Sequence, residues 1–207
     1  MKIGIFGGSF DPVHTGHVAL ARSAVESGMV DEVLFVPAAH QPFKPNQRPA
    51  DGRDRIRMIE KAIEGIPGLG VSDYELSRPD SVSYTIDTLT AMREKYGEAD
   101  EICFILGADS FLKIHTWKRA EELISSFPLI VGVRPGYEEQ ELLEQKKFLE
   151  ENFDADIVFL DNPAVDISST EIRARAAKLL ESGNSDMPDE IPEEIGEYII
   201  EQRLYHS

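Results

Sequence analysis

The stretch Lys2–His17, KIGIFGGSFDPVHTGH, decides the fold of this chain. Its first residues form a short apolar run, which predicts a buried strand at Lys2–Phe6. The adjacent glycines Gly7 and Gly8 then allow the backbone to approach another group closely. Apolar residues at helical spacing follow, and they predict a helix over Thr15–Gly28 that ends at its glycine. The stretch therefore predicts a strand, a glycine-rich loop and the N-terminus of a helix.

Strands and helices continue to alternate along the rest of the chain. Further strands are predicted at Glu32–Val36, Leu69–Glu75, Glu101–Leu106, Pro128–Val133 and Asp156–Leu160. Helices are predicted at Asp51–Ile63, Tyr84–Tyr96, in the region up to Ser126, and at Glu138–Glu151, Thr170–Leu180 and Glu193–Arg203. The proline-rich segment Pro37–Ala50 is predicted to be a loop.

This alternation predicts an α/β fold, with a Rossmann-like, doubly wound and mostly parallel sheet that carries helices on both faces. We expect one domain over residues 1–207, with a helical C-terminal part from about residue 166. Ligands of such sheets bind beyond the carboxyl ends of the strands. Functional residues are therefore expected just after Phe6, Val36, Leu106 and Val133.

Composition narrows the class of partner. The formal net charge is −17, and most of it comes from the part of the chain beyond residue 137. Such a surface repels nucleic-acid phosphates, so a general DNA or RNA binder is disfavoured. The sequence contains no apolar run of transmembrane length and no signal-peptide cleavage pattern. The one cysteine, Cys103, lies in an apolar strand, so we expect a buried thiol in a soluble, cytoplasmic protein.

Two histidines mark the loop after the first strand. His14 and His17 are three residues apart at the predicted helix start, with Gly16 between them. A helix N-terminus attracts anions through its free N–H groups and its dipole, and two imidazoles add further donors for phosphate oxygens. The pattern is not the dinucleotide-binding fingerprint, because the second strand ends at Val36 without an acidic residue. It is not a P-loop either, since the Gly-Lys-Ser/Thr sequence is absent.

Two other interpretations of these histidines are open. A zinc site would need at least a third ligand, and the remaining histidines are His40, His115 and His206. A purely structural role is the other alternative.

A second anion-binding helix start is predicted near the C-terminus, in Ile167–Arg173. Ser168, Ser169 and Thr170 supply three hydroxyls there, and Arg173 adds a guanidinium that suits phosphate. Ser168 and Glu171 also match a capping box, so a purely structural function is the alternative. Two such helix starts, one at each end of the chain, favour a site that holds a triphosphate.

The motif Gly-Gly-Ser-Phe-Asp-Pro-x-His-x-Gly-His resembles the signature of the nucleotidyltransferase superfamily. Further segments match the bacterial nicotinate-nucleotide adenylyltransferase family within it, and the resemblance runs from Lys2 to Tyr205. These segments are Glu75–Arg78, Ser83–Leu89, Gly107–Asp109 with Trp117, Ile167–Arg173 and Ile199–Tyr205. The resemblance implies that ATP and nicotinate mononucleotide are the substrates. Adenylyl transfer to the mononucleotide phosphate would give nicotinate adenine dinucleotide and pyrophosphate in NAD biosynthesis.

The resemblance also implies the site residues. Those expected at ATP are Gly7, Gly8, Ser9, Phe10, His14, His17, Gly107, Asp109, Ser168, Ser169, Thr170 and Arg173. Those expected at the mononucleotide are Ser9, Tyr84, Thr85, Trp117 and Arg134, with Trp117 stacked on the pyridine ring. Catalysis is assigned to His14, His17, Lys44 and Arg173. For Trp117 a place in the core is the alternative, and for Tyr84 and Thr85 a helix cap.

Mg²⁺ is the expected cofactor, carried by the phosphates rather than by a cage of protein ligands. The chain departs from the family at Phe43, where the usual residue is a histidine, and this puts one phosphate contact in doubt. Two alternatives to the function stay open, namely a related transferase with another phosphate acceptor and a nucleotide sensor without catalysis. No nucleic-acid or membrane partner is expected, and a homo-oligomer is an alternative to a monomer.

Overall fold

The computed structural model describes residues 1–39, 50–78, 82, 84–133, 136–163, 167–182 and 191–205. The strands are β1 (Lys2–Gly8), β2 (Glu32–Pro37), β3 (Leu69–Val71), β4 (Glu101–Gly107), β5 (Leu129–Gly132) and β6 (Ile157–Leu160). The longer helices are α1 (Thr15–Glu26), α2 (Gly52–Ile63), α3 (Thr85–Tyr96), α6 (Glu139–Phe153), α7 (Ser169–Ser182) and α8 (Glu193–Glu201). Three short helices lie between β4 and β5: α4 (Ala108–Phe111), the 3₁₀ helix η1 (Ile114–Thr116) and α5 (Ala120–Ser126).

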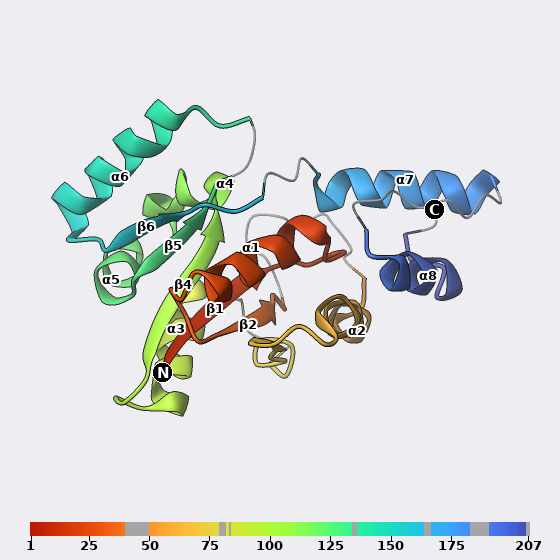
Figure 1. The fold of residues 1–207 in the computed structure, drawn as a ribbon, viewed down its shortest axis with the longest axis horizontal. Coiled ribbons are helices and arrows are strands. Elements are labelled where there is room, and N and C mark those ends of the chain that lie inside the picture. Colours follow the sequence, from red (N-terminus) through yellow and green to blue (C-terminus); the bar gives the residue numbers. More distant parts are fainter. Residues whose placement is uncertain are drawn as a thin grey trace.

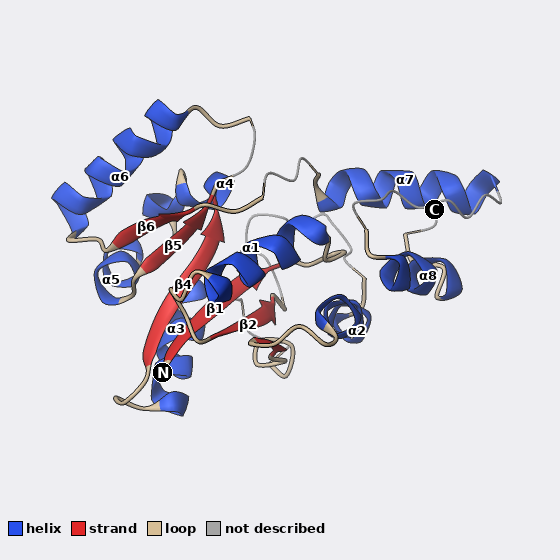
Figure 2. Cartoon of the chain, viewed as in Figure 1, coloured by secondary structure: helices blue, strands red, loops and turns tan. Residues whose placement is uncertain are grey.

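The six described strands form one sheet in the order β3-β2-β1-β4-β5-β6, and each neighbouring pair is parallel. The labelled strands run in the same direction in Figure 2. This confirms the predicted α/β class with a parallel sheet. Strand β1 is third in this order, and residues on both of its faces are buried, for example Ile5 on one face and Phe6 on the other.

Helices cover both faces of the sheet, as predicted. One buried cluster joins the sheet to α1, α2, α7 and α8, and it contains Ala21, Ile59, Ile172 and Ile195. The other joins the opposite face to α3, α5 and α6 through residues such as Leu89, Leu123 and Leu149. Figure 1 shows α1 lying across the sheet, with α7 and α8 together at one end of the molecule.

The third strand is shorter than the sequence predicted. The prediction ran to Glu75, but β3 ends at Val71, and its pairing with β2 stops at Phe35. The hydroxyl of Ser72 accepts a hydrogen bond from the backbone N–H of Tyr74 at 3.3 Å, which is a local turn contact. Because the serine side chain satisfies the backbone locally, the chain leaves the edge of the sheet there.

The strand order reverses direction between β1 and β4. From β1 the chain proceeds through β2 to β3, and it then returns to place β4 on the other side of β1. Loops that leave two such neighbouring strands in opposite directions open a crevice at their carboxyl ends. The loops after Gly8 and Gly107 meet at this position.

Candidate active site

A cavity of about 350 Å³ lies at this crevice. Its lining comes from the carboxyl ends of β1, β4 and β5, from the segment after β6, and from the N-termini of α1 and α7. All the residues that the sequence predicted for ATP line it: Gly7, Gly8, Ser9, Phe10, His14, His17, Gly107, Asp109, Ser168, Ser169, Thr170 and Arg173. Residues from the two ends of the chain therefore meet in one site.

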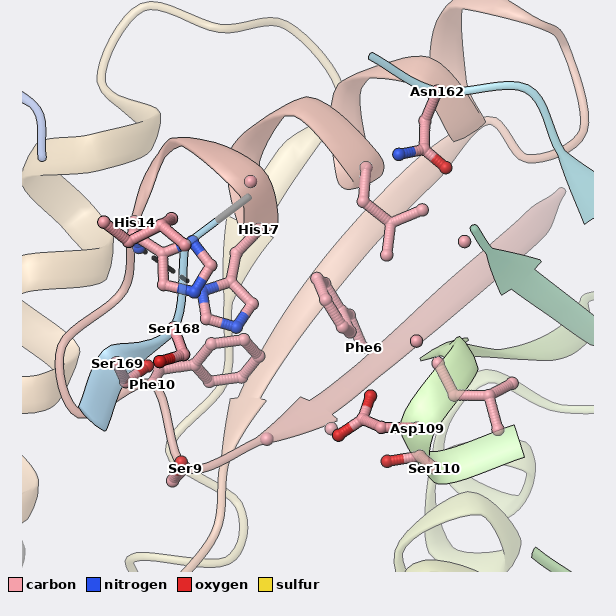
Figure 3. A pocket seen from close by; sticks show the side chains of 18 of the residues that line it. Phe6, Ser9, Phe10, His14, His17, Asp109, Ser110, Asn162, Ser168 and Ser169 are labelled. Carbon is pink, nitrogen blue, oxygen red and sulfur yellow. Dashed lines mark hydrogen bonds between the residues drawn. The ribbon is translucent and has the colours of Figure 1, made fainter. Parts of the chain in front are cut away.

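His14 and His17 stand together at the start of α1 (Figure 3). Their rings stack with centroids 3.7 Å apart. The Nδ1 atom of His17 accepts a hydrogen bond from the backbone N–H of His14 at 3.3 Å, as an N3 side chain does in a capping box. A ring nitrogen that accepts carries no proton, so a neutral His17 ring has its proton on Nε2 and offers it as a donor.

Aromatic packing fixes the orientation of His17. Its ring lies edge-on to Phe10, with centroids 5.1 Å apart, and 5.8 Å from the ring of Phe6. Phe10 is 1% exposed and has a φ of 46°, in the left-handed region that few side chains adopt. A Cβ on Gly8 would lie 3.0 Å from the Phe10 ring. The glycine therefore lets Phe10 fold back into the core beneath the histidine.

A buried arginine links the segments that follow β1 and β2. Arg55 on α2 is 3% exposed, and its Nη1 donates to the backbone oxygens of Ser9 and Ala38, both at 2.9 Å. Its Nε donates to the oxygen of Ala50 at 3.2 Å. Burial lowers the pKa of Arg55, and the charge of Asp11 opposes that shift. The sequence alone gave no sign of this arginine.

The start of α7 reaches across to the loop after β1. Ser168 and Glu171 form the capping box, with the Ser168 N–H and hydroxyl donating to the glutamate at 2.9 and 2.7 Å. The hydroxyl of Ser169 donates to the oxygen of Pro12 at 2.9 Å. Arg173 donates through Nη1 to the oxygen of Asp11 at 2.6 Å and through Nη2 to Thr170 Oγ1 at 3.2 Å. The capping function is therefore present, and the same helix start also lines the cavity.

The β4 side of the cavity carries Asp109 and Ser110, which Figure 3 shows beyond Phe6 from the histidines. A Cβ on Gly107 would lie 3.0 Å from Asp109 Oδ1, so glycine at this position leaves room for the carboxylate. Ser110 was not among the predicted site residues. It lies in the segment after Leu106 where functional residues were expected, whereas the family resemblance named only Gly107 and Asp109 there.

The residues predicted for the mononucleotide are only partly gathered. Ser9 and Trp117 line the cavity, and the half-buried Trp117 ring lies edge-on to Phe104 with centroids 6.1 Å apart. Tyr84 and Thr85 do not line it, but Tyr84 is the N-cap of α3, without a side-chain capping bond. Lys118 lies 6.0 Å from the centre of the Tyr84 ring.

Several predicted residues lie outside the described part of the chain, namely His40, Phe43, Lys44, Arg134 and His206. Conversely, Asn162 lines the cavity without having been predicted. Its side-chain oxygen accepts from the backbone N–H of Val133 at 3.2 Å and so joins the ends of β5 and β6. The sequence could have indicated Asn162, because it closely follows the predicted strand Asp156–Leu160 of the same parallel sheet.

The chain is similar in sequence to a known family of nucleotide-transferring enzymes. The cytidylyltransferase-like family matches residues 5–175. A probable nicotinate-nucleotide adenylyltransferase of Clostridium tetani is 38% identical over 204 residues, which cover 99% of this chain and 98% of the relative. The chain belongs to the nicotinate-nucleotide adenylyltransferase family. A probable member from Carboxydothermus hydrogenoformans is also 38% identical, over the same shares of both chains.

Solved structures support the fold. Plasmodium falciparum nicotinic acid mononucleotide adenylyltransferase, complexed with NaAD, superposes with a TM-score of 0.78 at 22% identity, covering 99% of this chain and 97% of that one. A putative nicotinate-nucleotide adenylyltransferase from Vibrio parahaemolyticus gives a TM-score of 0.66 at the same identity, covering 100% and 96% of the two chains. Both comparisons confirm the predicted fold.

The described residues also bear on metal and membrane binding. Among them, no group of three or more His, Cys, Asp or Glu side chains is placed to hold a metal ion. Asp109 is the only carboxylate that lines the cavity in this part of the chain. Within the same residues, no helix is both long and apolar enough to cross a membrane.

Proposed function

We propose that the protein transfers the adenylyl group of ATP to the 5′-phosphate of nicotinate mononucleotide. The products are nicotinate adenine dinucleotide and pyrophosphate, and the reaction is a step of NAD biosynthesis. The observation that carries the proposal is the cavity at the end of β1 and β4, where His14 and His17 meet the α7 residues Ser169 and Arg173. The full-length relatives named as nicotinate-nucleotide adenylyltransferases support the choice of substrates.

The reaction needs no nucleophile from the protein. An oxygen of the mononucleotide phosphate is already anionic, and it attacks the α-phosphorus of ATP. As the new P–O bond forms, the bond from the α-phosphorus to the oxygen of the β-phosphate breaks, and its electron pair leaves with pyrophosphate. The protein then contributes by positioning the two phosphates in line and by stabilising the charge that develops on their oxygens.

His17 is the residue to which we assign the transition-state contact. Its Nδ1 accepts from the backbone N–H of His14, so the neutral ring carries its proton on Nε2. We assign this Nε2–H as the donor to the α-phosphate. The stack with His14 and the edge contact with Phe10 keep the ring in place before substrate arrives. Such a donor costs little reorganisation during the reaction, which is the condition for strong electrostatic stabilisation.

The α7 start is assigned to the departing pyrophosphate. Ser169, Thr170 and Arg173 of its first turns line the cavity, and a helix N-terminus favours anions through its N–H groups and its dipole. Arg173 already donates to Thr170 and to the loop after β1, so the guanidinium is held at the rim rather than moving freely. Lys44 keeps its proposed assisting role, and it lies outside the described residues.

The cavity fits a magnesium ion that arrives with ATP. Mg²⁺ prefers oxygen ligands, keeps several of its waters and commonly uses one or two carboxylates besides phosphate oxygens. Asp109 is the lining residue that can meet that need, and it also suits the hydroxyls of the adenosine ribose. When bound, the ion would neutralise charge on the phosphates, while His17 and Arg173 donate to the oxygens that remain.

The mononucleotide is assigned to the side of the cavity that carries Trp117. Trp117 lines the cavity, and an indole suits a flat pyridine ring, while its contact with Phe104 holds it in place. We retain Ser9, Tyr84 and Thr85 as contacts for this substrate, with the N-terminus of α3 receiving the nicotinate carboxylate. Arg134 is retained as a contact as well, and it lies outside the described residues.

Pyrophosphate release from the purified protein with Mg²⁺ and ATP tests the proposal. Nicotinate mononucleotide and nicotinamide mononucleotide serve as alternative acceptors in parallel reactions. We expect turnover with the acid to exceed turnover with the amide, since the α3 N-terminus favours an anion. Equal use of both would keep the reaction and reject the carboxylate site. Absence of release with either would favour another phosphate acceptor, and ATP binding without any turnover would favour a nucleotide sensor.

A further inference from the structure

Asp11 joins segments that are far apart in the chain. It is 5% exposed and lies in the loop between β1 and α1, three residues before His14. Its Oδ1 accepts hydrogen bonds from the backbone N–H of Ala50 at 3.0 Å and from the hydroxyl of Tyr205 at 2.7 Å. Its backbone oxygen accepts from Arg173 at 2.6 Å. The loop between β1 and α1, helix α7 and the residue Tyr205 near the C-terminus therefore meet at the buried Asp11.

Arg173 lies beside the Asp11 carboxylate and also lines the cavity. Its Nη1 lies 4.0 Å from Asp11 Oδ2, which is at the outer limit of an ion pair. A charge-assisted hydrogen bond between such groups would need the two atoms to come about 1 Å closer. The same guanidinium lines the cavity, where a triphosphate is proposed to bind. Asp11 and ATP would thus compete for Arg173 if the carboxylate were free to turn toward it.

We propose that Tyr205 is a positioning residue that keeps Arg173 available to ATP, because its hydroxyl holds the Asp11 carboxylate away from the guanidinium. This inference rests on the proposed function. The geometry that points to it is the short bond from Tyr205 to Asp11, beside the longer separation of Asp11 from Arg173. Burial, together with the charge of Asp11, raises the pKa of Tyr205, so its hydroxyl is protonated and remains a donor.

The chain contains a matched control for this residue. The hydroxyl of Tyr198, on α8, also donates to an aspartate, Asp54 Oδ1, at 2.9 Å. That bond ties the C-terminal helix to α2, and neither of its residues lines the cavity. If Tyr205 served only to anchor the tail, the loss of either hydroxyl would have the same kind of effect.

Steady-state kinetics of Tyr205→Phe and Tyr198→Phe separate the two cases. In Tyr205→Phe we expect the KM for ATP to rise about tenfold, the scale of one hydrogen bond to a charged group. The KM for the mononucleotide and kcat should stay near the wild-type values, because Arg173 is recovered once ATP has bound. Tyr198→Phe should leave both KM values unchanged. A loss of active molecules in either variant would lower kcat and leave KM unchanged, so unstable protein does not imitate the expected result.

Asp11→Asn provides a rescue. A neutral amide oxygen still accepts from Ala50 but attracts the guanidinium much less, so Tyr205→Phe/Asp11→Asn should have an ATP KM close to that of Asp11→Asn alone. An unchanged ATP KM in Tyr205→Phe, an equal effect of Tyr198→Phe, or a double variant that keeps the full defect would overturn the inference. Calorimetric ATP affinities of the same proteins test the role of Tyr205 even if the wild-type protein shows no turnover. Absence of turnover would then count against the proposed function and not against this inference.

Discussion

Replacing His17 tests the assignment of the α-phosphate contact. The ring performs two tasks in the structure. Its Nδ1 accepts from the N-cap of α1, and its Nε2 is the donor that we direct at the reacting phosphate. His17→Ala removes both tasks, whereas His17→Gln keeps the first, because glutamine is a natural N3 residue of capping boxes.

The two variants should differ in stability and agree in turnover. Loss of one preorganised donor lowers kcat by about 10²–10³-fold, which is roughly 2.7–4 kcal/mol of transition-state stabilisation. Both variants should show this loss, since a glutamine that bonds to the N-cap cannot also reach the position of Nε2. His17→Ala should in addition lose about 1 kcal/mol of folding stability with its helix-cap contact. It also gives up the ring contacts with His14 and Phe10.

The assay combines initial rates of pyrophosphate release with urea unfolding of each variant. Turnover of the folded alanine variant within a few-fold of wild type would refute the transition-state role of His17. A glutamine variant that recovered wild-type turnover would show that only the helix cap mattered. Equal stabilities of the two variants would mean that the hydrogen bond to His14 contributes little.

Three further predictions concern packing and titration. Trp117→Ala should raise the KM for the mononucleotide and leave the KM for ATP nearly unchanged; an equal rise in both would reject the stacking assignment. Gly132→Ala should cost about 1–3 kcal/mol of stability in urea unfolding, since its Cβ would overlap the buried Leu20 side chain, and an unchanged midpoint would contradict this. Burial raises the pKa of Cys103 from 9.0 to about 11, so the native state holds the thiol proton more tightly. Stability should then fall as pH rises from about 9 to 11, by roughly 2–3 kcal/mol more than in Cys103→Ala, and parallel pH curves would exclude it.

The sequence predicted the fold well because local and long-range signals agree. The apolar strands, the glycine that ends α1 and the capping box of α7 all specify the same alternation that the structure contains. The predicted end of β3 was wrong. The hydrogen bond from the Tyr74 N–H to the Ser72 hydroxyl competes with sheet pairing, and the hydrophobic pattern of the sequence gives no sign of that bond. The single-domain assignment stays a prediction.

The site divides in the same way. Parallel strands bring their carboxyl ends together, so functional residues could be expected just after Phe6 and Leu106. The family resemblance then named Ser9 and Asp109 individually. The supporting groups could not. Arg55 contacts three backbone oxygens and Tyr205 contacts Asp11, which is 194 positions away in the chain. Such contacts depend on how α2 and the tail pack, and no spacing in the sequence encodes them.

Tracing the phosphates of ATP tests the central claim most directly. The wild-type protein would be incubated with Mg²⁺, nicotinate mononucleotide and ATP labelled at either the α- or the γ-phosphate. Adenylyl transfer predicts that the α-label appears in nicotinate adenine dinucleotide and the γ-label in an equal amount of pyrophosphate. Label from the γ-phosphate in the mononucleotide product, or α-label only in AMP, would contradict the account.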